Sequence, residues 1–156
     1  MLRKMLSVLL LTLMFFPTLV NADTVWVMCQ PDSYVNIRSK PNGRSRIEGY
    51  ALCGFDLETD GKTKDGFIHV YAPIEAGEGW ISKGYVVWDE PEEVNEWYSI
   101  RSPYRVAIRR TIGGKVRKWG HDQDSIRVYW ASSEWAVTNK GFVKTEFLEV
   151  DVDHGK

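Results

Sequence analysis

The residue types that support catalysis are sparse in this chain. Its three histidines, His69, His121 and His154, show no metal-ligand spacing with one another or with the two cysteines. His69 lies in a strand-like pattern and is interpreted as structural, while His121 lies in an acidic turn that lacks the glycine and terminal glutamate of a calcium loop. We therefore expect no catalytic residue, metal ion or cofactor, and a small hydrolase that uses His69 or His121 is the enzymatic alternative.

Aromatic side chains are the stronger functional signal, since the chain contains seven Trp and seven Tyr residues. Their rings offer rigid, amphipathic area on which sugar faces or apolar peptide side chains can stack. Several lie next to predicted loops, although core packing is the alternative for each ring. Together with two polar neighbours in one strand, the predicted ligand-binding residues are Tyr34, Asn36, Arg38, Tyr50, Trp88 and Trp130.

A second candidate surface is basic. The segment from Arg101 to Lys118 contains seven basic residues and no acidic one. Such a run is typical of a solvated face, and it also suits an anionic polymer such as a wall or surface polysaccharide. The predicted basic patch consists of Arg105, Arg109, Arg110, Lys115, Arg117 and Lys118.

These candidates are carried by a duplicated sequence. Gly79–Val86 (GWISKGYV) aligns without gaps with Gly141–Leu148 (GFVKTEFL), so that glycine matches glycine and aromatic residues match at two positions. An earlier pair of segments also matches, Val35–Arg38 with Val106–Arg109. Self-similarity of this kind indicates internal duplication.

Both copies have the periodicity of β-strands. Apolar and polar residues alternate in Tyr34–Arg38 and Ile126–Tyr129, and turns with glycine, such as Lys64–Gly66 and Asn139–Gly141, separate segments of this kind. Helical spacing is nowhere sustained for three turns after the first 22 residues. The sequence therefore predicts an all-β protein with two units in tandem, each of them a sandwich or a small barrel.

With these motifs in this order, the first copy resembles a bacterial SH3 domain, a family with an early asparagine-apolar-arginine-x-x-proline motif and a late glycine-tryptophan-apolar motif. The resemblance rests on Tyr34–Pro41, Gly49, Gly54, Phe67–Val70 and Gly79–Val86. The second copy is a divergent one, with Ala107 in place of the asparagine and Phe142 in place of the tryptophan. The resemblance implies SH3-like β-barrels, which often attach exported bacterial proteins to peptidoglycan.

The chain begins with the pattern of a secretory signal peptide. Arg3 and Lys4 precede an apolar run that ends at Phe16, and small residues up to Ala22 follow. We predict cleavage after Ala22 and a secreted, extracytoplasmic product of the cell envelope or periplasm, with an uncleaved anchor as the alternative. Without Arg3 and Lys4, the 20 basic residues become 18 against 21 acidic ones, a net charge of −3. Nucleic acid is therefore not an expected partner.

Two cysteines, Cys29 and Cys53, follow the predicted cleavage site. An even number of cysteines in an exported protein favours a disulfide, because oxidising compartments allow the bond to persist. Two separate buried thiols are the alternative.

Charge also indicates where one domain ends. The segment 89–96 holds five acidic residues, no basic one and Pro91, which is the composition of a linker. The predicted organisation is a signal peptide at 1–22, a first domain at 23–88, an acidic linker at 89–96, a second domain at 97–150 and a C-terminal tail at 151–156.

The sequence thus predicts a secreted, non-enzymatic binding protein that recognises peptidoglycan, another cell-envelope polymer or a peptide, with membrane contact only during export. The alternative is a protein–protein adaptor or inhibitor that acts on an exported partner.

Overall fold

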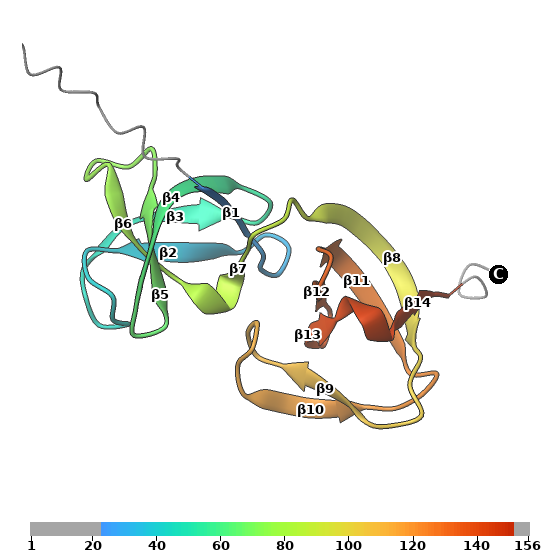
Figure 1. Cartoon of the computed structure of the whole chain (residues 1–156). Helices are drawn as coiled ribbons and strands as arrows, with labels where there is room; N and C mark the ends of the chain where they lie inside the picture. Colours follow the sequence, from blue (N-terminus) through green and yellow to red (C-terminus); the bar gives the residue numbers. More distant parts are fainter. Residues whose placement is uncertain (1–22, 152–156) are drawn as a thin grey trace, which may run out of the picture.

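The computed structural model describes residues 23–151, which form two small antiparallel β-barrels lying side by side (Figure 1). The predicted signal peptide, His154 and the tail beyond residue 151 lie outside the described residues. The all-β prediction is confirmed, because within residues 23–151 the only helical elements are two 3-10 turns. Accordingly, this range holds no helix with the length and apolarity that a membrane span requires.

Each barrel contains seven strands and one 3-10 turn. The elements of the first are β1 (Asp23–Val27), β2 (Tyr34–Arg38), β3 (Ile47–Leu52), β4 (Asp56–Lys64), β5 (Phe67–Tyr71), β6 (Glu78–Ser82), η1 (Lys83–Tyr85) and β7 (Val86–Val87). Those of the second are β8 (Glu92–Ile100), β9 (Val106–Arg109), β10 (Val116–Gly120), β11 (Ser125–Ala131), β12 (Trp135–Thr138), β13 (Gly141–Lys144), η2 (Thr145–Phe147) and β14 (Leu148–Val150).

The two sheets have the same strand order, as the duplicated sequence predicts. The first sheet runs β3-β2-β6-β5-β4-β1-β7, and the second runs β10-β9-β13-β12-β11-β8-β14. Every strand of the second barrel therefore takes the place of the strand seven numbers earlier. The 3-10 turns also correspond, since each precedes the last strand of its barrel.

The repeated arginines have the same structural role in both barrels. Nη1 of Arg38 donates a hydrogen bond to the carbonyl oxygen of Ser45 at 2.8 Å. Nη1 of Arg109 donates to the carbonyl oxygen of Gly114 at the same distance, 2.8 Å. Both guanidinium groups thus bind the backbone of the loop that follows their own strand.

The repeated glycines allow a close approach of two strands in each barrel. A Cβ atom at Gly79 would lie 2.6 Å from Cγ2 of Ile37, and one at Gly141 would lie 2.5 Å from the carbonyl oxygen of Arg109. Contacts this short are not tolerated, so the first residue of the octet must be glycine for β6 and β13 to pair with β2 and β9.

Each barrel has its own apolar core, built from the inward-facing residues of its strands. In the first barrel the core includes Val25, Val27, Ile37, Ile68, Val70 and Ile81, all at most 1% exposed. In the second it consists of Ile100, Val106, Ile108, Ile126 and Val143.

A third apolar cluster joins the barrels. Its buried members are Met28 and Val87 from the first barrel and Trp135, Val137 and Phe142 from the second. Val137 is 0% and Phe142 2% exposed, so these residues are as buried as those of either core. We call this cluster the junction core.

Hydrogen bonds between the barrels fix their relative orientation. Nε2 of Gln30 donates to the carbonyl oxygen of Thr138 at 2.9 Å, and the backbone N–H of Ile112 donates to the carbonyl oxygen of Gly84 at 2.9 Å. Both bonds link residues of different barrels, so the two units pack in one defined orientation.

The predicted acidic linker is wrong over most of its length. Residues 92–96 form the first part of β8, in which Glu96 pairs with Val128 and Glu93 with Trp130 of β11. Strand pairing uses the backbone, and an antiparallel strand can carry charged side chains on its solvated face. The acidic side chains of Glu92, Glu93 and Glu96 are exposed accordingly. The second barrel therefore starts at residue 92 and not at residue 97.

The predicted disulfide is confirmed. Cys29 and Cys53 are bonded, with their Cα atoms 5.3 Å apart, and the described residues contain no free cysteine. The bond joins the end of β1 to the turn before β4, next to the junction core. A disulfide of this kind is typical of oxidising, extracytoplasmic compartments.

The junction gives a testable prediction at Gly54. This residue has φ of +79°, and a Cβ atom on it would lie 2.6 Å from Cη2 of Trp130 in the other barrel. Gly61 has φ of +75° with nothing within 4 Å, so Gly61→Ala has the same backbone strain without the contact. We expect Gly54→Ala to lower the free energy of unfolding by about 1–3 kcal/mol more than Gly61→Ala, because Trp130 must move. Urea unfolding followed by tryptophan fluorescence measures the difference, and equal losses would contradict the tight contact.

Candidate ligand-binding groove at the junction of the barrels

The structure brings predicted residues from both barrels into one groove. A cavity of about 490 Å³ lies at the junction, with Tyr34 and Asn36 of the first barrel on one side. Arg110, Arg117 and Asn139 of the second barrel also line it. We call this cavity the basic groove. Its volume lies within the range of small-molecule binding sites.

Strand alternation positions the first wall. In β2, Val35 and Ile37 point into the core, so Tyr34 and Asn36 point outward. Tyr34 is 58% exposed, which leaves most of its ring open to a ligand. Asn36 is half-buried and pairs with Tyr50 of β3.

The second wall is formed by the β9–β10 hairpin and by a turn. Arg110 follows β9 directly, and Arg117 lies in β10 where the register against β9 shifts between Val116 and Lys118. Such an irregularity changes the direction of the local side chains. Asn139 lies in the turn between β12 and β13, later in the chain than the hairpin, and it also lines the groove.

The groove is positively charged. Its lining includes two guanidinium groups and no carboxylate. Neither Arg110 nor Arg117 has an ion pair or a side-chain hydrogen bond within residues 23–151. A neighbouring depression of about 320 Å³ is lined by the same two arginines. The guanidinium groups of Arg110 and Arg117 are thus both available to bind an anion.

Several predicted site residues lie elsewhere. Arg38 and Arg109 bind loop backbone, as described above, and Arg105 lies over the ring of Trp119 at 5.1 Å. Trp130 is half-buried against Gly54 at the junction. The remaining ones are exposed but do not line the basic groove: Tyr50, Trp88, Lys115 and Lys118.

The sequence did not predict several other residues of the groove. Gln30, Tyr85 and Asn139 line it as well. The sequence pattern places Asn139 only in a turn and Tyr85 only in the repeated octet. None of the three has a local signal for the groove, because Gln30 lies in the loop after β1, Tyr85 in η1 and Asn139 in the turn after β12, and only the tertiary structure brings these segments together.

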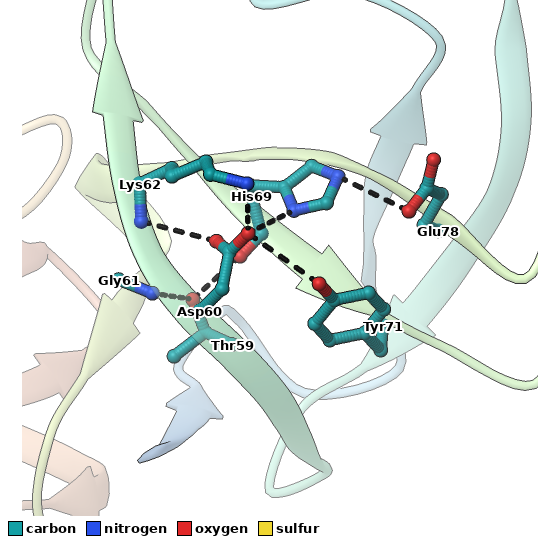
Figure 2. Close-up of polar contacts among 7 residues, drawn as sticks. All are labelled: Thr59, Asp60, Gly61, Lys62, His69, Tyr71 and Glu78. Atoms are coloured by element: carbon teal, nitrogen blue, oxygen red, sulfur yellow. Dashed lines mark hydrogen bonds and ion pairs between the residues drawn. The ribbon is translucent and has the colours of Figure 1, made fainter. Parts of the chain in front are cut away.

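A polar cluster on the first barrel surrounds His69 (Figure 2). Nδ1 of His69 lies 3.2 Å from Oδ2 of Asp60, and Nε2 lies 3.7 Å from Oε2 of Glu78. The Tyr71 hydroxyl donates to the same Asp60 oxygen at 3.4 Å, and Nζ of Lys62 lies 2.8 Å from it. Every group in this cluster has a partner, so it is a closed network and fits the structural interpretation of His69.

The network holds Asp60 in its charged form. The Asp60 side chain is 7% exposed. The hydrogen bond from Lys62 lowers the pKa of the carboxyl from 3.8 to about 2, with a smaller contribution from His69, although burial acts in the opposite direction.

Within residues 23–151, no group of three or more His, Cys, Asp or Glu side chains is arranged to hold a metal ion. His121 is exposed, and its Nδ1 lies 3.8 Å from Oδ2 of Asp124 in the same turn.

The fold and the groove together define a two-barrel, all-β protein with a basic, aromatic-lined groove at the junction. No protein-family model and no curated protein matches the chain. Among solved structures, NlpC1 from Trichomonas vaginalis is 13% identical, with 83% of this chain and 46% of that chain covered and a TM-score of 0.34. NlpC2 from the same organism is 12% identical, with 83% and 48% covered and a TM-score of 0.35. The chain spans less than half the length of these two structures, and at these values the likeness assigns it no function.

The Asp60 network predicts a specific acid sensitivity. Because the folded pKa lies below the unfolded value, the network stabilises the protein above pH 3.8 and loses this effect as the pH falls toward about 2. We expect the urea midpoint of the unmodified protein to fall more between roughly pH 5 and pH 2 than that of Asp60→Asn, which cannot ionise. Lys62→Met keeps the acid but removes its main partner, and should show an intermediate loss. Identical pH profiles for all three proteins would contradict the role of the network.

Proposed function

We propose that this chain is a secreted, non-enzymatic binding protein that holds an anionic polymer of the cell envelope in the basic groove, with peptidoglycan as the first candidate. The observation that carries the proposal is the lining of the groove: two unpaired arginines, an exposed tyrosine and side-chain amides, without a carboxylate.

The chemistry of these groups suits a sugar polymer with acidic substituents. Guanidinium groups bind carboxylates and phosphates through paired N–H donors, which gives both affinity and orientation. The Tyr34 ring can stack on the apolar face of a sugar, while the amides of Asn36 and Asn139 can bond its hydroxyl groups. The groove thus combines the three kinds of contact that such a ligand needs.

Two further features support an envelope location. The sequence carries a signal-peptide pattern, and the Cys29–Cys53 disulfide is of the kind that persists in oxidising compartments. The resemblance of the first copy to bacterial SH3 domains points in the same direction.

A protein partner is the second candidate, and it has its own supporting surface. Tyr50, Leu52 and Phe55 are 63%, 45% and 53% exposed and line a pocket of about 360 Å³ on the first barrel. The Tyr50 ring packs on Tyr34 with ring centroids 5.3 Å apart, so the apolar surface continues to the edge of the basic groove. Exposed apolar patches of this kind often mark protein–protein contacts.

The test is retention on purified peptidoglycan. We expect the protein to bind at low salt, and Arg110→Glu/Arg117→Glu to reduce binding at least about tenfold, because two charge-assisted contacts are lost. Lys115→Glu/Lys118→Glu is the matched control, with the same change in net charge on the same hairpin but outside the groove.

Equal retention of the two double variants would show that the groove is not the site. No retention of the unmodified protein at low salt would reject wall binding. In that case, capture of a stoichiometric protein from the culture medium, abolished by Tyr50→Ser/Phe55→Ser, would favour the adaptor.

A further inference from the structure

A second cleft lies at the junction, and we propose that it binds amino acids or short peptides through a free carboxylate. It has a volume of about 430 Å³ and shares Ser33 with the basic groove. Its lining includes Leu52 of the first barrel and Glu93, Arg127, Tyr129 and Trp130 of the second. We call it the Arg127 cleft.

The guanidinium group of Arg127 has N–H groups that no residue of the described range occupies. Its Nη2 donates to Oδ1 of Asn95 at 2.9 Å, while its Nε is buried without a hydrogen-bond partner among the described residues. Nor does its guanidinium group form an ion pair within residues 23–151. Because buried polar groups in folded proteins are nearly always bonded, a residue that lines a cleft and keeps a buried N–H unbonded calls for a partner. A carboxylate is the partner that matches the paired N–H groups of a guanidinium ion.

The backbone around Arg127 is shaped to hold it. The register of β8 against β11 shifts at Tyr129, so that Val94 and Asn95 both lie opposite this residue in a bulge. Asn95 has φ of 56° there, and its side chain is hydrogen bonded to Arg127. On the other wall of the cleft, Asp32 has φ of 54°. Non-glycine residues with positive φ are uncommon, Asn and Asp being the types that adopt it most readily, and two of the four within residues 23–151 line this cleft.

The remaining lining selects the class of ligand. Leu52 is 45% exposed and, with Tyr129 and Trp130, provides an apolar wall. Glu93 and Asp32 place acidic groups in the same cleft, in contrast to the basic groove, which has none. A ligand with a carboxylate, an apolar side chain and an ammonium group satisfies all three features, and this is the chemistry of an amino acid or a short peptide.

The test uses the dipeptide Ala-Leu and its C-terminal amide, followed by the NMR signals of the Arg127 Nε–H and the Trp130 indole. We expect saturable shifts with Ala-Leu and an affinity at least about tenfold lower for the amide, which lacks the carboxylate. Arg127→Gln should cause the same loss. Arg110→Gln in the basic groove should leave the affinity unchanged.

Equal affinity for the dipeptide and its amide would overturn the proposal, as would full binding by Arg127→Gln or no saturation at about 10 mM dipeptide. If Arg127→Gln does not fold, the comparison of dipeptide and amide on the unmodified protein still decides. This test is independent of the basic groove. Arg110→Glu/Arg117→Glu changes the groove and not the Arg127 cleft, so this variant should still bind Ala-Leu even where it no longer binds peptidoglycan.

Discussion

The packing of one barrel on the other is the constraint on which both clefts depend. Val137 and Phe142 are buried against Met28 and Val87 in the junction core, and the bond from Gln30 to Thr138 fixes the orientation. Burial of apolar area stabilises by about 25 cal/mol per Å², so a continuous apolar contact resists the relative motion that is usual between small domains. Since the walls of the basic groove come from different barrels, its shape exists only while this contact holds.

The two copies also differ in chemistry on the face that the second barrel uses at the junction. In the second barrel, Val137 pairs with Phe142 across β12 and β13, and this pair is buried in the junction core. At the same place in the first barrel, His69 pairs with Trp80 across β5 and β6. One copy thus uses this face for contact with its neighbour, while the other covers it with the Asp60 network. Duplication supplied two similar barrels, and divergence on one face made their association asymmetric.

The sequence predicted much of the fold because the relevant signals are local. Strand alternation, glycine turns and the repeated octet each depend on a few neighbouring residues, and the all-β architecture followed from them. The disulfide followed from the even number of cysteines after a signal-peptide pattern. The linker prediction is wrong because acidic side chains do not prevent a strand from forming. Strand β8 needs only its backbone to pair with β11, and its glutamates project into water. Four residues of the basic groove were predicted as site residues: Tyr34, Asn36, Arg110 and Arg117. The sequence did not predict that they share one site, because about 75 residues separate the first two from the last two.

By itself the sequence indicated two all-β units in tandem, favoured the Cys29–Cys53 bond and showed a high content of aromatic residues and one basic segment. Its octet indicated duplication, and the close strand approach at Gly79 and Gly141 gives the physical reason for the repeated glycine. Tertiary structure alone decided what those aromatic residues do: Tyr85 of the first octet meets Phe142 of the second across the junction, with ring centroids 6.0 Å apart. Contacts between distant segments depend on which faces remain apolar after each barrel has closed, and that cannot be read from local periodicity.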